Sequence, residues 1–318
     1  MLEEPIGTVL PTLDKCILFC LKIIYIGLRI LLRIALGKKR RDRLYAKLVF
    51  NLTHFSPSFS LFTFFYRSVT YLKLSKQTKL LKIKVPKYNY KAYCPVNKND
   101  FINMTIREDD IIERFTPKEG DIVVDIGAHV GRYAIIASKR VGANGKVIAI
   151  EASPLNFEML NRNTNINQLT NIISLNYAAY SKETKINLYL PAKEKGFTIY
   201  NTVMVGRAQT EEDSFVTVNA NTIDNLLLLL QQQEQNGIGH ANINWIKIDV
   251  EGAELEVLKG ASDILSKSKN IALLIEIHNL PGDTNFYTQI VEFLRSFNFK
   301  IDFEKTYEGG EKHLILRK

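Results

Sequence analysis

The chain has 318 residues, of which 46% are hydrophobic, and it carries a formal net charge of +9. This length and composition predict a protein with a sizeable core and exclude a single small module. The cysteines Cys16, Cys20 and Cys94 all lie within the first hundred residues. The sequence therefore offers no disulfide framework, no Cys/His zinc cluster and no cysteine nucleophile in the remainder.

The charge is unevenly distributed along the chain. Residues 1–100 contain 19 Lys and Arg against 5 Asp and Glu (+14), which leaves 23 against 28 (−5) for the remainder. From about residue 85, short β-branched runs alternate with helical stretches. We therefore expect a basic, apolar, helical N-terminal region at 1–84 and an α/β domain at 85–318.

The first apolar run, CILFCLKIIYIGLRILLRIAL at 16–36, is interrupted by Lys22, Arg29 and Arg33. These cations share one helical face, which favours a helix that lies in the headgroups, because each cation at mid-bilayer costs about 2.5–3.5 kcal/mol. A membrane-spanning helix and a buried helix on the core are the alternatives. The basic cluster at 38–43 favours anionic lipid and the cytoplasmic face of the membrane.

A second apolar run, FSPSFSLFTFFY at 55–66, is rich in phenylalanine and is followed by basic residues. Aromatic and basic residues in this arrangement suit a membrane interface, although they also occur in nucleic-acid-binding proteins. We expect residues 16–84 to bind a membrane surface. Because the basic charge lies outside a net acidic core, we expect no nucleic-acid partner. The predicted location is the cytoplasmic face of the membrane, and otherwise the cytoplasm.

The remainder predicts a doubly wound, mainly parallel sheet with Rossmann-like topology. Seven strands are predicted, at 121–125, 146–151, 171–176, 244–249, 271–277, 298–303 and 312–317. Helices are predicted at 131–140, 154–166, 222–234, 254–266 and 284–296. A Gly-Gly turn before the last strand predicts an antiparallel hairpin at the end of the chain.

Carboxylates recur where the predicted strands end. Asp125, Glu151, Asp249 and Glu276 end the first, second, fourth and fifth strands. Packing alone does not favour this pattern, because burying an unpaired charge is costly. Ligands of such sheets bind at the carboxyl ends of the strands, and this edge is therefore the predicted site.

The turn after the first strand reads D-x-G-x-x-x-G, from Asp125 through Gly127 to Gly131. A dinucleotide turn prefers G-x-G-x-x-G beside a pyrophosphate, which a carboxylate would repel. A ligand with an ammonium group and no phosphate suits the carboxylate better. S-adenosylmethionine is such a ligand, and Glu151 would then hold its ribose.

Five stretches together resemble the FkbM family of S-adenosylmethionine-dependent methyltransferases. They are VVDIGAHVGRYA (123–134), GKVIAIEASPLNFEMLNRNTNINQLTNI (145–172), TVNANTIDNLL (217–227), IKIDVEGAELEVLKGA (246–261) and LLIEIH (273–278). The resemblance covers roughly residues 90–318. It implies the class I methyltransferase fold and O-methylation of a hydroxyl on a small molecule, a glycan or a lipid-linked acceptor.

Matched position by position, the family's cofactor-binding residues correspond to Asp125, Gly127, Gly131, Glu151, Asn176 and Ala178. The resemblance implies that the first three hold the methionine part, that Glu151 binds the ribose and that the last two pass the adenine. His129 stands where the family commonly has Asn.

For the acceptor, Asp249 and Glu251 are predicted catalytic residues, because a base must stand beside the sulfonium, past the fourth strand. Glu276 and His278, at the end of the fifth strand, are the other candidates, and His278 is included because a histidine titrates near neutral pH. Asp249, Glu251 and Glu276 offer oxygen ligands for magnesium, but no spacing compels a metal and we predict none. The irregular insertion predicted at 191–215, with Tyr200 and Arg207, is a candidate lid over the acceptor.

Three other functions are compatible with parts of the sequence. The basic charge suggests an RNA methyltransferase, and the glycine turn alone fits a non-catalytic nucleotide-binding module or an NAD-linked oxidoreductase. No N-P-P-Y type block for base amines is present, and Asp125 disfavours NAD.

Overall fold

The structure is a computed structural model of the chain, and it describes residues 80–95, 108–190, 214–233, 243–280, 282–307 and 309–318. These residues belong to one compact unit. The apolar runs at 16–36 and 55–66, as well as Tyr200 and Arg207, lie outside them, and the division at residue 84/85 stays a prediction. Within the described ranges, no helix has the length and apolar character needed to cross a membrane.

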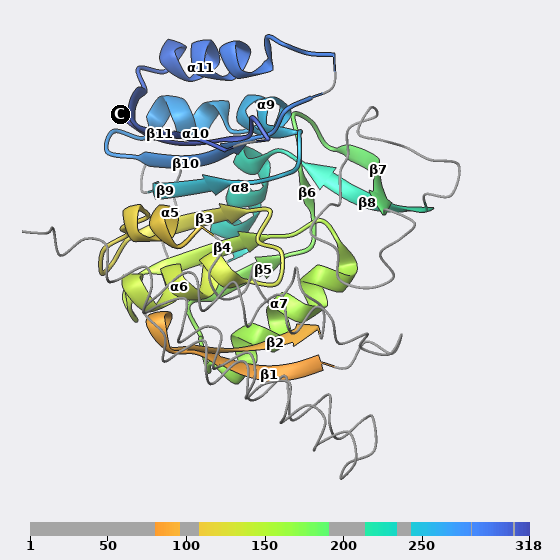
Figure 1. Ribbon diagram of the computed structural model, residues 1–318, viewed down its shortest axis with the longest axis vertical. Helices are drawn as coiled ribbons and strands as arrows, with labels where there is room; N and C mark the ends of the chain where they lie inside the picture. Colours follow the sequence, from red (N-terminus) through yellow and green to blue (C-terminus); the bar gives the residue numbers. More distant parts are fainter. Residues whose placement is uncertain (1–79, 96–107, 191–213, 234–242, 281, 308) are drawn as a thin grey trace, which may run out of the picture. The chain divides into compact units, whose positions relative to one another are not determined.

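The described part is built on a seven-stranded sheet, whose strands are stacked as Figure 1 shows. In spatial order they are β11 (Lys300–Thr306), β12 (Lys312–Arg317), β10 (Ala272–Ile277), β9 (Ile243–Ile248), β3 (Ile122–Ile126), β4 (Lys146–Ile150) and β5 (Ile172–Leu175). Within this sheet β12 is antiparallel to both of its neighbours, β10 and β11, whereas every pair from β10 to β5 is parallel. All seven predicted strands are confirmed, as are the terminal hairpin and the mainly parallel sheet of the class I methyltransferase fold.

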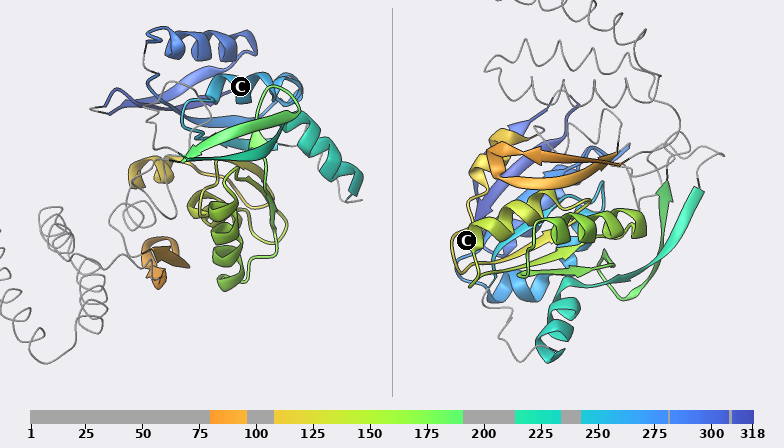
Figure 2. Two further views of the ribbon diagram at one scale, coloured as in Figure 1. Left: turned by 90° about the vertical axis from the view of Figure 1, so that its right-hand side faces the viewer. Right: turned by 90° about the horizontal axis from the view of Figure 1, so that it is seen from below.

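Helices cover both faces of this sheet (Figure 2). One face packs against α8 (Ile223–Gln233), α9 (Glu254–Lys259), α10 (Ser262–Lys267) and α11 (Phe286–Ser296). The other face packs against α6 (Arg132–Val141) and α7 (Pro154–Ile166), and the ring of Phe115, which follows α5 (Asp109–Arg114), contacts Trp245 of β9. Alternate residues of each strand enter the two layers, as the two-residue period of a strand requires. On the first face these residues are apolar, for example Ile246 and Ile248 of β9.

The helix predicted at 254–266 is wrong, because the structure divides it into α9 and α10 at Gly260. A Cβ atom at Gly260 would collide with the backbone carbonyl of Tyr180. A segment distant in sequence therefore presses on the chain at this point, and only glycine leaves room for it.

Three further elements were not predicted. A hairpin of β1 (Leu80–Val85) and β2 (Tyr90–Pro95), joined by the short helix η2 (Pro86–Tyr88), docks on α7, where the Tyr93 N–H donates to Asn163 Oδ1 at 2.6 Å. The helix α5 is the second. The third is a small sheet of β6 (Ala178–Ala179), β8 (Ser214–Asn221) and β7 (Thr184–Leu190), in that order, which lies beside the main sheet in Figure 1. The insertion predicted as irregular to residue 215 thus ends where β8 begins.

Candidate active site

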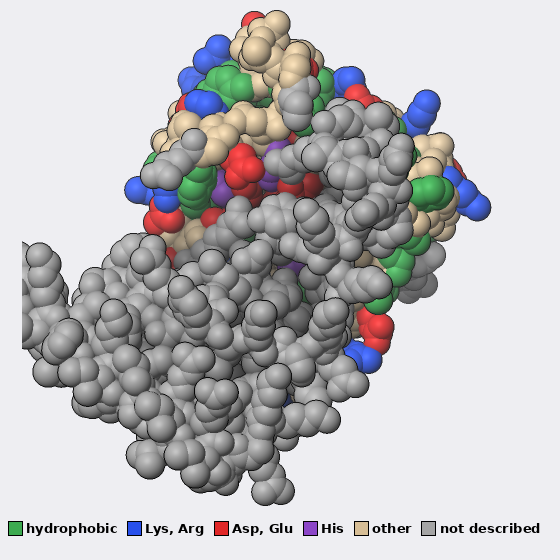
Figure 3. All heavy atoms as spheres, turned by 45° about the vertical axis from the view of Figure 1, so that its right-hand side comes forward, with side chains coloured by type: hydrophobic (Ala, Val, Ile, Leu, Met, Phe, Trp, Pro, Cys, Tyr) green, Lys and Arg blue, Asp and Glu red, His purple; other side chains and the backbone are tan. Residues whose placement is uncertain are grey.

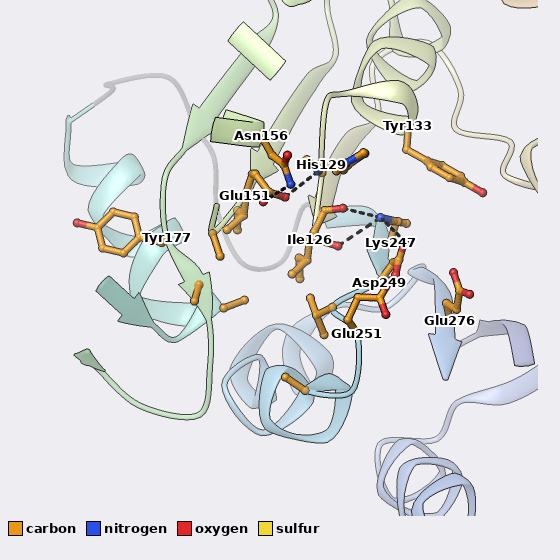
Figure 4. Close-up of a pocket in the computed structure, with 18 of the residues that line it drawn as sticks. Ile126, His129, Tyr133, Glu151, Asn156, Tyr177, Lys247, Asp249, Glu251 and Glu276 are labelled. Atoms are coloured by element: carbon orange, nitrogen blue, oxygen red, sulfur yellow. Dashed lines mark hydrogen bonds and ion pairs between the residues drawn. The ribbon is translucent and has the colours of Figure 1, made fainter. Parts of the chain in front are cut away.

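A cavity lies at the carboxyl ends of β3, β4, β9 and β10, the edge that the sequence predicts. The half nearer β4 is lined by Ile150, Glu151, Ala152, Asn156, Tyr177, Ala178, Ala179 and Leu188. The other half is lined by charged residues together with Tyr133: Glu108, Arg132, Lys247, Asp249, Glu251 and Glu276. Figure 4 shows Glu151 with Asn156 in one part of the cavity and Asp249 with Glu276 in another. The cavity thus joins a mostly apolar half to a charged half.

The turn between β3 and α6 is shaped by close backbone packing. Gly127 lines the cavity with a positive φ of 71°, and a Cβ atom there would overlap the backbone oxygen of Asp249. Gly131 has a φ of 96° and begins α6, and a Cβ atom would lie 2.7 Å from Leu160 Cδ1. Both predicted glycines are therefore required by the packing of the protein itself. Gly127 also faces the cavity.

Glu151 follows β4 and is bound to the same turn. Its Oε2 accepts the backbone N–H of His129 at 2.8 Å, and its Oε1 accepts that of Ser153 at 2.9 Å. The side-chain amide of Asn156 lies 3.4 Å from Oε1. The residue is only 6% exposed, and this burial raises its pKa from 4.5 to about 7, although the hydrogen bonds act in the opposite direction. The carboxyl group faces the cavity and has acceptor positions for hydroxyl groups.

Asn176 and Ala178, which follow β5, occupy different places. The Asn176 side-chain amide donates to the backbone oxygens of Glu151 (2.8 Å) and Ala152 (3.1 Å), so its described contacts hold the loop after β4. Tyr177 and Ala178 line the cavity instead. An aromatic ring and small apolar side chains form a suitable wall for a planar base.

Asp125 differs from the prediction of a direct ligand contact. Its side chain is fully buried and is not among the residues that line the described cavity. Lys247 stands opposite it on β9, with Nζ 3.4 Å from Asp125 Oδ1 and 3.5 Å from Asp249 Oδ2. The sequence predicts the Asp125 carboxylate beside the ammonium group of a ligand, whereas the structure places the ammonium group of Lys247, from the neighbouring strand, beside it. Asp125 therefore positions Lys247, and Lys247 lines the cavity.

Lys247 is held in place by further groups. Its Nζ donates to the backbone oxygen of Gly127 at 2.9 Å and lies 5.3 Å from the centre of the Tyr133 ring. Burial alone would lower its pKa, but Asp249 and Asp125 outweigh burial and raise the pKa above its usual value. Lys247 therefore carries a positive charge inside the cavity wall. A lysine in the buried strand INWIKI was the sequence signal for this role, which the prediction did not use.

The turn after β9 brings two predicted catalytic carboxylates to the cavity. The Asp249 N–H donates to the oxygen of Ile126 at 3.1 Å, which joins this turn to the end of β3. Glu251 adopts a left-handed conformation with a φ of 57°, which is uncommon for a non-glycine residue. Asp249 and Glu251 both line the cavity.

His278 lies directly after β10 and is 3% exposed. Its Nδ1 is 2.7 Å from Glu254 Oε1, while its Nε2 lies 3.4 Å from Glu251 Oε2 and 3.7 Å from Glu276 Oε1. Burial alone would lower its pKa, but Glu254, Glu251 and Glu276 outweigh burial and raise the pKa to about 10. These carboxylates favour the protonated imidazole, which has no lone pair to accept a proton, and the base role of His278 stays a prediction.

A second histidine, His313 on β12, lies opposite Glu276 and was missed from the sequence. Its Nε2 is 3.3 Å from Glu276 Oε2 and 3.7 Å from Glu108 Oε2, and Glu108 also accepts the Tyr133 hydroxyl at 3.0 Å. Burial alone would lower the pKa of His313, but Glu276 and Glu108 raise it. Figure 3 shows acidic and histidine side chains gathered together on one face of the molecule.

Parts of the chain are similar to known proteins. A sequence model of the methyltransferase FkbM domain matches residues 125–301, a range that contains all the cavity-lining residues except Glu108. Methyltransferase sdnD of Sordaria araneosa is 26% identical over 190 residues, which are 54% of this chain and 73% of that protein. Hexuronic acid methyltransferase AglP of Haloferax volcanii is 27% identical over 205 residues, which are 61% of this chain and 76% of that protein. The solved FkbM methyltransferase of Methylobacillus flagellatus has a TM-score of 0.44 at 14% identity, over 87% of this chain and 59% of that chain.

Proposed function

Because the chain belongs to the FkbM family of S-adenosylmethionine-dependent methyltransferases, we propose that it methylates a hydroxyl oxygen of a sugar, either in a glycan or on a lipid-linked acceptor. The observation that carries this proposal is that one cavity is lined by Glu151, whose carboxylate we assign to the ribose, and by the carboxylates Asp249 and Glu251. The relative named as a hexuronic acid methyltransferase supports a sugar as the acceptor.

The residues present fit the cofactor. Glu151 offers a buried carboxylate to the ribose hydroxyls, and Tyr177 and Ala178 offer an apolar wall to the adenine. Lys247 offers a positive charge to the methionine carboxylate, and Asp249 offers a negative charge to its ammonium group. When bound, S-adenosylmethionine supplies a sulfonium methyl group to a nucleophilic oxygen.

The protein must align the acceptor oxygen and remove its proton. Asp249 and Glu251 are the two cavity carboxylates on the turn after β9, and we assign proton removal to one of them. Because Asp249 is assigned to the methionine ammonium group and also faces the Lys247 ammonium, Glu251 is the carboxylate of this turn that we assign to the acceptor. The protonated His278 beside Glu251 attracts the negative charge of this carboxylate and orients it.

An RNA acceptor is disfavoured by the same groups. The carboxylates of Glu108, Asp249, Glu251 and Glu276 line one half of the cavity and would repel a phosphate backbone. A neutral sugar hydroxyl meets no such repulsion.

The function is tested by binding and transfer assays on the purified full chain. Calorimetry should detect S-adenosylmethionine binding, and Glu151→Ala should abolish or greatly weaken it. Glu251→Gln should keep cofactor affinity and lower the transfer rate to a sugar acceptor about 10²–10⁴-fold, the usual contribution of a positioned base. Mass spectrometry of glycans from cells with and without the gene should show the acceptor without its methyl group. Unchanged glycans, together with no transfer to any sugar, would refute the proposal.

We also propose that residues 16–84 hold the enzyme at the cytoplasmic face of a membrane. The support is the sequence alone: the cationic stripe of the apolar run at 16–36 and the basic cluster that follows it. Each basic residue near anionic lipid contributes roughly 1 kcal/mol, so Arg40→Gln with Arg41→Gln should weaken binding to phosphatidylglycerol vesicles about 30-fold. Equal sedimentation of the full chain and this variant with such vesicles would contradict the proposal.

A further inference from the structure

Three polar side chains converge where β9 and β10 end. Asp249 follows β9, Glu276 belongs to β10, and His278 comes directly after β10. His278 Nε2 lies 3.7 Å from Glu276 Oε1 and 3.9 Å from Asp249 Oδ1. One ligand atom from each of the three residues lies within 4.8 Å of the others. Because Asp249 and Glu276 line the cavity, the centre of this group borders its charged half.

These distances exceed those of hydrogen bonds, which are about 2.7–3.2 Å. They do agree with the spacing of atoms that share one metal ion. Nitrogen and oxygen ligands lie about 2.0–2.2 Å from such an ion, so two of them are about 3.4 Å apart at a tetrahedral angle and about 4.2 Å apart when they lie opposite. The distances from Nε2 to the Glu276 and Asp249 oxygens fall between these two values.

The imidazole is oriented in the way that metal-binding histidines are. The other ring nitrogen, Nδ1, lies 2.7 Å from Oε1 of the fully buried Glu254, and that oxygen also accepts the Gly252 N–H at 3.0 Å. A carboxylate on the far nitrogen fixes the ring and increases the basicity of the ligating nitrogen. The ring is therefore held with Nε2 toward Asp249 and Glu276.

The second oxygen of each carboxylate lies near a basic side chain. The second oxygen of Glu276 lies 3.3 Å from His313 Nε2, and the second oxygen of Asp249 lies 3.5 Å from Lys247 Nζ. His278 and Glu276 are each 3% exposed, so this is not a solvated acidic surface. A further cation between the buried Glu276 and the partly exposed Asp249 would lower the cost of bringing the two carboxylates together.

We propose that Asp249, Glu276 and His278 bind a divalent cation. Magnesium and calcium prefer oxygen ligands alone, whereas one imidazole with two carboxylates suits a first-row transition ion such as Mn²⁺. The ion takes the place of the Nε2 proton of His278, because a ligating imidazole must be neutral.

The consequence for catalysis rests on the proposed function. An ion at this position has coordination sites toward the cavity, where it would bind the acceptor oxygen and lower the pKa of its hydroxyl group. With Asp249 bound to the ion, Glu251 is the carboxylate left on this turn to accept the proton.

Binding of Mn²⁺ alone to the full chain, freed of metal by a chelator, tests the site without any measurement of activity. Electron paramagnetic resonance should show one bound Mn²⁺ per chain, and Mn²⁺ should raise the thermal midpoint. His278→Gln and Asp249→Asn should each weaken binding at least about 10-fold, and Glu254→Gln, which removes the orienting contact, about 10–100-fold. The exposed carboxylate of Glu158 provides a control variant, Glu158→Gln, that should bind like wild type.

A neighbouring group of Glu108, Glu276 and His313 is the competing location. His313→Gln should therefore bind Mn²⁺ more tightly than His278→Gln, and the reverse order would overturn the assignment. So would the absence of saturable binding by wild type at millimolar Mn²⁺, or wild-type affinity in His278→Gln. If His278→Gln fails to fold, Asp249→Asn provides the same comparison, because Asp249 is more exposed.

Failure of the ion and failure of the proposed function have different signatures. Full transfer to a sugar after chelation, with no Mn²⁺ binding, refutes the ion and supports the function. Mn²⁺ binding that His278→Gln removes, with no transfer to any sugar hydroxyl, supports the ion and refutes the function.

Discussion

Glu151 should make the folded protein less stable as the pH rises. Its pKa is about 7 in the folded protein against 4.5 in the absence of burial, so the folded protein binds this proton more tightly than the unfolded chain does. Through this group the free energy of unfolding is highest below pH 4.5 and falls as the pH rises toward 7. Between pH 5 and pH 8 the decrease should be about 2–3 kcal/mol, since each pKa unit corresponds to about 1.4 kcal/mol.

Glu151→Gln removes this titration while it keeps the size of the side chain. Urea denaturation of wild type and variant at pH 5, 6, 7 and 8 gives the free energy of unfolding of each. The difference, variant minus wild type, should increase by about 2–3 kcal/mol from pH 5 to pH 8. Other titrating groups cancel, because both proteins contain them, and a lost hydrogen bond shifts the difference equally at every pH.

The control is Glu158→Gln, which removes an exposed carboxylate from α7. It tests whether the loss of a negative charge is sufficient to produce the trend. A Glu151→Gln difference that is constant between pH 5 and pH 8 would refute the argument that burial perturbs this carboxyl. Below pH 7 the protonated carboxyl accepts fewer hydroxyl groups, so cofactor affinity should weaken in the same range in which the fold gains stability.

Two other substitutions test the packing of the site. Lys247→Met should lower the free energy of unfolding in urea by about 3–5 kcal/mol, because it leaves the fully buried Asp125 without its partner. Adding Asp125→Asn should restore part of that loss, and additive losses would contradict the pairing. Gly127→Ala should prevent folding or abolish cofactor binding, since a Cβ atom would overlap the Asp249 backbone. The control is Gly120→Ala, because Gly120 has a similarly positive φ and no described atom lies within 4 Å of the added Cβ. This variant should lower the free energy of unfolding by only about 1 kcal/mol. Equal decreases of the thermal midpoint in Gly127→Ala and Gly120→Ala would refute the steric argument.

The main sheet could be predicted because its signal is local. Each parallel strand is a β-branched run, and those that build the site end in a carboxylate, as in Val123 to Asp125 and Lys146 to Glu151. The placement of these acids at one edge follows from parallel topology alone. Glu151, Asp249, Glu251 and Glu276 do line one cavity, and their chemical roles stay predictions.

What was missed depends on contacts between distant segments. The hairpin at 80–95 lies in a strongly basic stretch, where charge obscured the strand pattern, and it is fixed by hydrogen bonds to Asn163 and Asn167 of the α7 region. The break at Gly260 depends on Tyr180, and the role of Asp125 depends on Lys247. No single-residue pattern reports which partner will stand opposite across a sheet.

The contact between Gly127 and the Asp249 backbone links the two halves of the cavity. The turn after β3 and the turn after β9 are joined by close packing and by the Asp249 N–H to Ile126 oxygen bond. A shift of one turn therefore displaces the other, and this contact sets the spacing between the two sides of the cavity. A substitution that displaces one turn, such as Gly127→Ala, should therefore disturb both sides of the cavity at once.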